Sequence, residues 1–374
     1  MPHALSGTTA LTGLLLALTI ACTDTSEPTR ASPTSPASAA AAQDAGAPTL
    51  HEQHSGTTNR LQAISPVSGL VAWASGVGGT YTVTRNGGQT WRPGVVPGAE
   101  ALQFRDVEAV SGQEAYLLSA GTGEDARIYH TVDGGRTWKL QFKNRDPAAF
   151  YDCFAFWTPD RGIVMADAVD GRFPVRRTVN GRFWPDIGDR LPAAQEGEAA
   201  FAASGTCVAT QGNDRAWIAT GGAEKARILA TTDGGDSWRA YETPIVQGTP
   251  ASGVFTVAFR DAQHGILAGG DLDHPDTRSR NVAVSSDGGK TWTLAANAPF
   301  PGAAYGLSYA AGHDQGPFNK RVVVTGPGGA AWSEDEGAAW TRLRGVRDYW
   351  AVAFANSEVG WLVGTEGRIL KITF

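Results

Sequence analysis

A short motif that ends in tryptophan recurs along this chain and restricts its possible folds more than any other feature. Three copies are nearly identical: Thr131–Trp138 (TVDGGRTW), Thr231–Trp238 (TTDGGDSW) and Ser285–Trp292 (SSDGGKTW). Three more are divergent: Thr84–Trp91 (TRNGGQTW), Thr178–Trp184 (TVNGRFW) and Ser333–Trp340 (SEDEGAAW). Successive tryptophans are 46 to 54 residues apart, which is enough for four short strands with their turns. This pattern is typical of a β-propeller.

The motif predicts a tight turn between two strands of one blade. Its Asp or Asn side chain can accept backbone N–H groups within its own turn, and its glycines permit the positive φ that the reversal needs. We interpret these side chains as structural rather than catalytic. We expect the tryptophans to pack between adjacent blades, with Trp138, Trp238 and Trp292 largely buried. The structural positions are Asn86, Trp91, Asp133, Trp138, Asn180, Trp184, Asp233, Trp238, Asp287, Trp292, Asp335 and Trp340.

The number of units predicts the number of blades. Each unit is expected to contain strands A, B and C, then the motif, then an outer strand D. The last segment, Asp348–Phe374, supplies three strands and ends where its motif should begin. A strand around Thr49–Ser55 can supply the fourth and bring both ends of the chain into one sheet. We therefore predict an all-β, seven-bladed propeller over residues 49–374. Six blades are the alternative, because six motifs are visible.

This region resembles the Asp-box, or BNR repeat, propellers of the photosystem II stability/assembly factor group. Besides the motifs, the resemblance rests on Val359–Gly364 (VGWLVG) followed by Gly367–Leu370 (GRIL), which His264–Gly269 and Arg161–Met165 echo. It implies a propeller and, from the photosynthetic members, a non-enzymatic assembly chaperone. Sialidases are more distantly similar. Their Arg-Ile-Pro motif has only a loose counterpart in Arg172–Val175 (RFPV), so none of their catalytic residues is carried over.

The N-terminal segment indicates export. Residues 10–20 form an apolar run that is too short to cross a bilayer, and the run ends in Thr19-Ile20-Ala21-Cys22. This pattern is similar to a bacterial lipoprotein signal, in which the cysteine is lipidated after cleavage. We predict a signal peptide over residues 1–22 with lipidation at Cys22, and an ordinary cleaved signal is the alternative. Residues 23–48 are mostly Ala, Ser, Thr and Pro and are expected to form a disordered tether. The predicted location is the periplasmic or cell-surface side of a bacterial membrane.

Charge and motifs exclude several function classes. The net charge is −6, from 31 Lys and Arg against 37 Asp and Glu, so there is no basic excess of the kind that nucleic-acid-binding proteins carry. The sequence contains no Gly-rich phosphate-binding loop and no nucleophile elbow. We expect no nucleic-acid partner, no cofactor and no metal, and a monomeric protein whose contact with the membrane is through the lipid.

The D–A and B–C loops of a propeller share one face, and long loops on such a face commonly carry function. In the third to fifth units these loops contain acids, one histidine and several arginines. The candidate residues are Tyr151, Asp152, Asp167, Asp170, Arg172, Glu196, Glu198, Asp271, Asp273, His274, Asp276, Arg278 and Arg280. Three interpretations compete: solvated loops, a site for a partner protein or glycan, and a hydrolase that uses two carboxylates or a metal. No catalytic residue is assigned.

Two cysteines, Cys153 and Cys207, lie within the predicted propeller. Aligning Asp160-Arg161 with Asp214-Arg215 places them at equivalent positions on inner strands of neighbouring blades. Equivalent positions in blades related by a rotation point in rotated directions, so the geometry of a disulfide should be missed. Export would favour oxidation. The prediction is two buried, unpaired thiols, with a disulfide as the alternative.

The function predicted from these patterns is that of a binding or assembly module. It would be exported, tethered to the membrane and non-catalytic, and its partner would be a protein or a glycan. The alternative is a glycan-processing hydrolase with its acidic residues on the loop face of units three to five. Two carboxylates that converge in a deep central pocket would distinguish the hydrolase.

Overall fold

The structure, a computed structural model, describes residues 46–311 and 319–374. The predicted signal peptide, Cys22 and nearly all of the predicted tether lie outside the described residues. Within these residues, no helix is long and apolar enough to cross a membrane. The helical turns found there are short 3₁₀ segments, namely η1 (Gly123–Asp125), η2 (Gly188–Arg190) and η3 (Thr365–Gly367).

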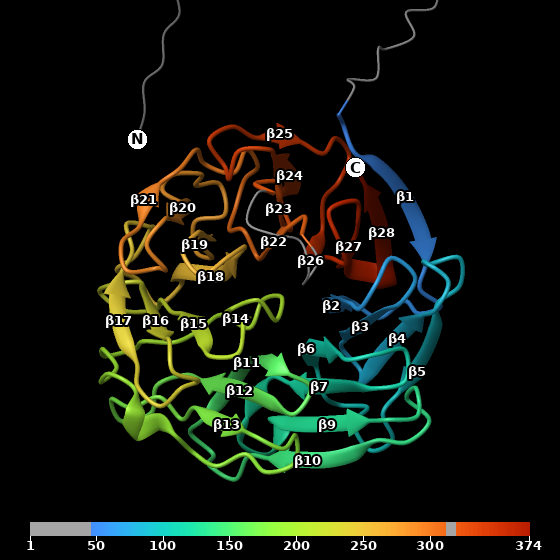
Figure 1. The fold of residues 1–374 in the computed structure, drawn as a ribbon, viewed down its shortest axis with the longest axis horizontal. Coiled ribbons are helices and arrows are strands. Elements are labelled where there is room, and N and C mark those ends of the chain that lie inside the picture. The colour runs from blue at the N-terminus through green and yellow to red at the C-terminus, as the bar shows by residue number, and fades with distance from the viewer. Residues whose placement is uncertain (1–45, 312–318) are drawn as a thin grey trace, which may run out of the picture. The chain divides into compact units, whose positions relative to one another are not determined.

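The described residues form seven four-stranded antiparallel sheets, arranged as blades around a central channel (Figure 1). Blade 1 contains β2 (Leu61–Pro66), β3 (Ala72–Gly76), β4 (Thr80–Thr84) and β5 (Arg92–Val95). Blade 2 contains β6 (Phe104–Ala109), β7 (Ala115–Ser119), β9 (Arg127–Thr131) and β10 (Lys139–Lys143). Blade 3 contains β8 (Gly121–Thr122), β11 (Phe150–Thr158), β12 (Arg161–Ala166) and β13 (Arg176–Thr178). Blade 4 contains β14 (Val208–Gln211), β15 (Arg215–Ala219), β16 (Arg227–Thr231) and β17 (Arg239–Glu242).

The remaining blades complete the ring, so the prediction of seven blades is confirmed and the six-bladed alternative is wrong. Blade 5 contains β18 (Ser252–Phe259), β19 (Gly265–Asp271), β20 (Val282–Ser285) and β21 (Thr293–Leu294). Blade 6 contains β22 (Gly306–Tyr309), β23 (Val322–Gly326), β24 (Gly329–Ser333) and β25 (Thr341–Arg342). Blade 7 contains β26 (Tyr349–Phe354), β27 (Val359–Gly364), β28 (Arg368–Thr373) and β1 (Thr49–His54).

Strand β1 closes the ring from the N-terminal side, as the truncated last unit predicts. It pairs with β28 over its whole length, from Thr49 opposite Thr373 to His54 opposite Arg368. Gln53 on this strand joins blade 7 to blade 1. Its Oε1 accepts hydrogen bonds from the indole N–H of Trp361 in blade 7 and of Trp91 in blade 1, both at 3.0 Å.

The repeated motifs form turns between the third strand and the outer strand, here called the repeat turns. In blade 2, Asp133 accepts the hydroxyl of Thr131 at 2.9 Å and the backbone N–H of Thr137 at 2.9 Å. The hydroxyl of Thr137 adds a further bond to the carboxylate, and these bonds hold the pKa of Asp133 at about 2. Gly134 and Gly135 have φ values of 77° and 85°, which favour glycine. Equivalent bonds recur at Asn86, Asp233, Asp287 and Asp335.

Tryptophans fill the spaces between blades, but not only those of the repeat turns. Trp238 and Trp292 are buried, as expected, whereas Trp138 is half-buried and packs against Trp73 and Tyr81 of the preceding blade. The completely buried tryptophans are instead on the second strands: Trp73, Trp217 and Trp361. Their indole N–H groups donate to the next blade or to β1. Trp73, for example, bonds the carbonyl of Ser111 at 2.8 Å.

Blade 3 departs from the expected A-to-D order. Its motif is one residue shorter, and the chain after it makes an isolated bridge between Arg176 and Asp186 instead of an outer strand. The fourth strand of the sheet is β8, which pairs with the beginning of β11 on the inner side. The shortened turn at Asn180 bonds the N–H groups of Arg182 and Phe183, so the chain is not aligned to continue along β13.

Hydrogen bonds from side chains link the inner strands of neighbouring blades. Ser65 of blade 1 accepts the N–H of Ala109 in blade 2 at 3.0 Å. The same kind of bond joins Thr256 of blade 5 to Leu307 of blade 6 at 3.1 Å. Asp106 of blade 2 accepts the N–H of Phe154 in blade 3 at 2.8 Å. These bonds satisfy backbone groups on inner edges that have no neighbouring strand.

Replacing Gln53 with Ala should destabilise the ring. The substitution leaves the buried N–H groups of Trp91 and Trp361 without their acceptor, and each such group costs about 1–3 kcal/mol. We expect the free energy of unfolding in urea to fall by roughly 2–5 kcal/mol. Glu52→Ala, at the exposed neighbouring position on β1, is the control and should change it little. Equal unfolding midpoints for the two variants would show that Gln53 does not close the ring.

Candidate functional site

Irregularities in the inner strands place a set of side chains toward the axis of the ring. The ladders between first and second strands are interrupted after Leu61, Phe104, Tyr151, Val254 and Tyr349. At each point one extra residue lies outside the ladder, and a bulge re-aims its side chain. The first strand of a blade has its free edge toward the channel, so the extra side chains are directed there. We call this set the bulge layer; its members are Gln62, Arg105, Asp152, Phe255 and Trp350.

The two aromatic members of the bulge layer, Phe255 and Trp350, belong to a row of aromatic rings that crosses four blades. Phe201 stacks on Phe255 with ring centroids 3.9 Å apart, and Phe255 lies 5.9 Å from Tyr305. Tyr305 meets Trp350 edge-on at 5.0 Å, and the guanidinium of Arg60 lies 4.5 Å above the ring of Trp350. All but Phe255 are half-buried. The row therefore offers apolar ring surface and one cation to a ligand.

The other members of the bulge layer are polar. Arg105 donates to the side chain of Gln103 at 2.9 Å and to the carbonyl of Ala202 at 3.3 Å. Asp152 is buried beside Asp167, and burial together with this neighbouring acid raises the pKa of Asp152 well above its usual value. Burial also raises the pKa of Asp167, to about 6. Gln62 is completely buried, and neither end of its amide has a hydrogen-bond partner among the described residues.

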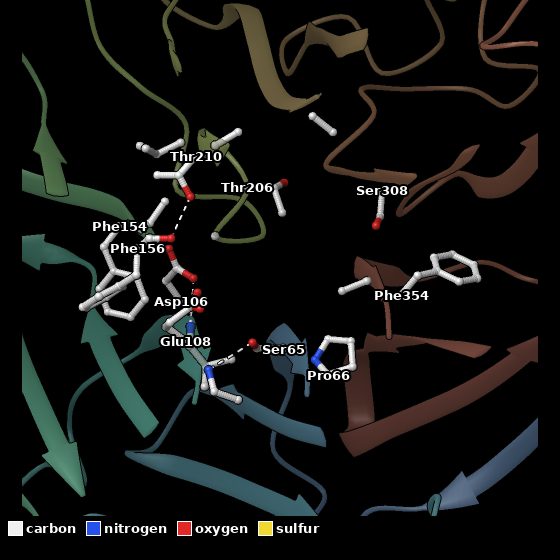
Figure 2. Close-up of a pocket in the computed structure, with 18 of the residues that line it drawn as sticks. Ser65, Pro66, Asp106, Glu108, Phe154, Phe156, Thr206, Thr210, Ser308 and Phe354 are labelled. Atoms are coloured by element: carbon white, nitrogen blue, oxygen red, sulfur yellow. Dashed lines mark hydrogen bonds between the residues drawn. The ribbon is translucent and has the colours of Figure 1, made fainter. Parts of the chain in front are cut away.

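Beyond the bulge layer the channel widens into a cavity of about 570 Å³, lined by residues of all seven blades (Figure 2). The lining comes mainly from the later part of the inner strands and from the turns that follow, and in blade 4 also from residues 204–206 before β14. No described residue of the bulge layer lines it, so the cavity and the exposed parts of the layer lie toward opposite ends of the channel. The cavity has the size of a small-molecule site.

Among the described residues, Asp106 and Glu108 are the carboxyl groups that line this cavity, and they differ in their environment. Both oxygens of buried Asp106 are engaged: one accepts the N–H of Val107 and the other that of Phe154, each at 2.8 Å. Glu108 is half-buried at the cavity wall (Figure 2). Burial raises its pKa to about 8. It is therefore largely protonated at neutral pH.

This arrangement does not suit a hydrolase that uses two carboxylates. Such an enzyme needs both groups to be free, one on each side of the scissile bond. Asp106 is committed to the backbone of blade 3, and it shares a strand with Glu108. The second pair, Asp152 and Asp167, is enclosed: Asp152 is buried, and Asp167 accepts the N–H of Ala200 at 2.9 Å. The geometry favours binding over hydrolysis.

Besides Asp152, two further candidates of blades 3 and 4 lie in the interior. Tyr151 is completely buried, and its hydroxyl accepts a hydrogen bond from Arg176 at 2.8 Å. Glu198 is buried against the guanidinium of Arg227 and accepts the hydroxyl of Thr220 at 2.6 Å. Both side chains hold the D–A and B–C loops in place instead of facing a ligand.

The remaining candidates of blades 3 and 4 are at the surface. Asp170 lies in a tight turn with a φ of 52°, and Glu196 is exposed. Arg172 pairs with two acids of the segment after the repeat turn, Asp186 and Asp189. This pairing fixes the loop to its own blade, and it leaves Arg172 as part of a surface ion-pair network.

The long loop of blade 5 begins with a buried acid. Asp271 accepts the backbone N–H of Asp273 at 3.0 Å and contacts Nδ1 of His274 at 2.9 Å, which raises the pKa of that histidine. Arg280 donates to the carbonyl of Pro244 at 2.8 Å. The other two candidates are exposed: Asp276 and Arg278. Among the described residues, no group of three His, Cys, Asp or Glu side chains could hold a metal ion.

The prediction of two unpaired thiols is wrong, because Cys153 and Cys207 form a disulfide with their Cα atoms 6.0 Å apart. Cys153 lies within the ladder of β11, opposite Met165, but Cys207 precedes β14. The N–H of Ala219 nevertheless donates to the carbonyl of Cys207 at 2.8 Å, so Cys207 continues the pairing of β14 with β15 at the position equivalent to Cys153. The inner strands of the two blades approach closely there, and Cα atoms 6.0 Å apart are within the range of a disulfide despite the rotation between the blades. Both cysteines are completely buried, so the bond links the two blades internally.

Solved structures with this architecture include two of YCF48. A structure described as YCF48 bound to D1 peptide has 16% identity and a TM-score of 0.60, covering 88% of this chain and 98% of that one. YCF48 from Cyanidioschyzon merolae has 18% identity and a TM-score of 0.61, covering 87% and 98%. The fold is that of the YCF48 propellers. The expected likeness to photosystem II assembly factors is thus confirmed at the level of the fold.

A glycoside hydrolase is also similar in fold. The GH74 enzyme of Niastella koreensis has 16% identity and a TM-score of 0.57 over 86% of this chain, which corresponds to 53% of the enzyme. This chain therefore spans about half the length of that enzyme. No family model matches the chain, and a search of curated proteins finds no match. At these identities the similarity to YCF48 and to GH74 establishes the fold alone.

The bulge layer and Glu108 were missed in the sequence because a bulge leaves no mark in an isolated strand. Gln62, Arg105 and Trp350 are single residues in otherwise ordinary strands, and their direction depends on the partner strand. Glu108 could have been noticed, since Asp106 and Glu108 interrupt an inner strand with two acids. The loop acids attracted attention because they are clustered along the chain.

Replacing Glu108 with Gln should alter the pH dependence of stability. The folded protein holds the pKa of Glu108 near 8, above the value of 4.5 for an unperturbed glutamate, so the folded state binds the proton more tightly than the unfolded state. This carboxyl therefore costs stability as the pH rises from about 4.5 to 8, whereas Gln does not titrate. We expect Glu108→Gln to raise the melting temperature at pH 8.5, relative to the unmodified protein, more than at pH 5. Equal differences at both pH values would contradict the burial of this group.

Proposed function

We propose that this propeller is a non-catalytic module that binds a protein partner at the end of the channel that carries the bulge layer. The observation that carries the proposal is the row of half-buried rings that ends with Arg60 above Trp350. Aromatic and arginine side chains contribute most of the energy at protein interfaces. The rings come from separate blades, so the ring-shaped fold holds them rigidly before a partner arrives and keeps the entropic cost of binding low.

The loops around this end of the channel suit a partner larger than a single small molecule. The blade 5 loop is exposed from Leu272 to Arg280, and the turn at Asp170 lies in blade 3. A similar propeller fold, YCF48, has been solved bound to a D1 peptide, which supports a peptide segment as the ligand class. A glycan is the other ligand class that aromatic rings and planar polar side chains can hold.

Selection of peptides from a random display library tests the proposal, with a glycan array in parallel. We expect the protein to enrich peptides whose affinity falls at least about tenfold in Trp350→Leu, which corresponds to about 1.4 kcal/mol. Trp332→Leu is the control, because Trp332 is a half-buried tryptophan that packs on Phe374 in the wall of blades 6 and 7.

Each outcome of this selection has a definite meaning. Peptides that bind Trp350→Leu as well as the unmodified protein would show that the bulge layer is not the site. Binding to glycans but not to peptides would show that the partner is a glycan and not a protein. Release of reducing sugar from such a glycan would establish a hydrolase and overturn the non-catalytic function.

We further propose that the module works outside the cytoplasm on a lipid anchor at Cys22. The disulfide between Cys153 and Cys207 supports this location, because disulfides form and persist in oxidising compartments such as the periplasm. The Ala, Ser, Thr and Pro segment between Cys22 and the propeller would let the module range over the membrane surface. It would thereby bring the bulge layer to partners in or near the membrane.

Fractionation of bacteria that express the full chain tests the anchor. We expect Cys22→Ser to move the protein from the membrane to the soluble fraction, because stable anchoring depends on burial of the acyl chains. The double variant Cys153→Ser and Cys207→Ser is the control, since it removes cysteines but leaves the anchor. Retention of Cys22→Ser in the membrane would exclude lipidation at this position as the anchor.

A further inference from the structure

The cavity at the other end of the channel has a lining that presents hydrogen-bond acceptors. Several hydroxyl groups on its wall donate their hydrogen to other groups of the protein. Thr210 donates to the carbonyl of Phe156 at 2.7 Å, and Ser308 donates to the carbonyl of Tyr309 at 3.1 Å. Thr206 donates to the hydroxyl of Thr256 at 2.8 Å. A hydroxyl that has given its hydrogen offers lone pairs to a ligand.

The charged groups of the wall leave one carboxyl available. Asp106 accepts two backbone N–H groups with its two oxygens. Arg260, the cation in the described lining, contacts Asp261 at 2.7 Å and Glu336 at 2.5 Å. Of the two described carboxyl groups in the lining, Glu108 is the one that does not accept backbone N–H groups with both oxygens (Figure 2). A ligand that complements this wall carries several N–H donors and a positive charge.

We propose that the channel cavity binds an alkylammonium group, either of a linear polyamine or of a lysine side chain. The ammonium would pair with the carboxylate of Glu108, and its remaining hydrogens would reach hydroxyl oxygens on the same side of the cavity, such as that of Thr210 (Figure 2). A metal ion fits the wall less well, because the described residues contain no cluster of three ligating side chains. The cavity volume of about 570 Å³ accommodates a small organic cation.

This binding should be coupled to release of a proton. Burial raises the pKa of Glu108 to about 8, so the empty cavity holds the acid mostly protonated at pH 7, and a bound ammonium would displace that proton. The other titratable groups in the described lining are Asp106, Tyr309 and Arg260, and the Glu108→Gln variant separates the titration of Glu108 from theirs. The pKa of Asp106 and the pKa of Tyr309 are both raised well above their usual values by burial. Arg260 stays charged, because its acidic neighbours raise its pKa.

Calorimetric titration of the purified full chain tests the proposal, with spermidine and N-acetyl-lysine methylamide as separate probes. We expect at least one probe to bind with an affinity that rises about tenfold between pH 6.5 and 8.5. We also expect binding at pH 7 to release protons from the protein, which is measured by comparing the binding enthalpy in two buffers of different ionisation enthalpy. Glu108→Gln should weaken binding at pH 8.5 at least tenfold and remove the pH dependence. Glu358→Gln is the matched control, since Glu358 is an exposed acid in the first turn of blade 7.

The two probes distinguish the source of the ammonium. Binding of spermidine alone identifies a free polyamine, binding of the lysine derivative alone identifies a side chain of a partner, and binding of both leaves the alkylammonium as the common ligand. Absence of binding by both, or an equal loss in Glu108→Gln and Glu358→Gln, overturns the proposal. Proton release by the unmodified protein tests it independently of whether Glu108→Gln folds.

Discussion

The free inner edges of the seven sheets impose the constraint on which the rest of the structure depends. Apart from the short pairing of β8 with the beginning of β11 in blade 3, the first strand of each blade has N–H and C=O groups that face the channel and have no further strand to pair with. Water or side chains must satisfy these groups. In this protein the side chains come from the neighbouring blade: Ser65 bonds Ala109, and Asp106 bonds Phe154. The same bonds that satisfy the edges also set the positions of the blades relative to one another.

This constraint explains why the two ends of the channel differ. Bulges near the beginning of the inner strands turn large side chains toward the axis, and the rings of Phe255 and Trp350 fill space there. Past the bulges the wall includes short side chains such as those of Ser65 and Ser308 beside larger ones, and a cavity stays open there. Some hydroxyls in this wall, such as that of Thr210, donate their hydrogen to a neighbouring strand and offer lone pairs to a ligand. The acceptor character of the cavity is therefore a consequence of how the ring is held together.

Closure of the ring brings together residues from the two ends of the propeller. Gln53 on β1 receives the indoles of Trp91 and Trp361, so the first and last blades share one acceptor. A second link between blades is covalent: the disulfide from Cys153 to Cys207 joins blades 3 and 4. Because blade 3 has no regular outer strand, this bond reinforces the blade whose repeat turn is shortest. The rigidity that results is what a preorganised binding surface requires.

The sequence by itself determined the architecture, because the repeat turns are local. Asp133 bonds residues two and four positions away, so a short motif carries everything that its turn needs, and its spacing counts the strands. The truncated last unit likewise required a strand from Thr49–Ser55. The sequence did not determine the site. Which side chains face the channel depends on bulges between paired strands, and the pKa of Glu108 depends on burial by other blades. The disulfide also depended on tertiary structure, because the equivalent positions of Cys153 and Cys207 in their repeats do not tell how closely the inner strands of the two blades approach, and here the Cα atoms are 6.0 Å apart.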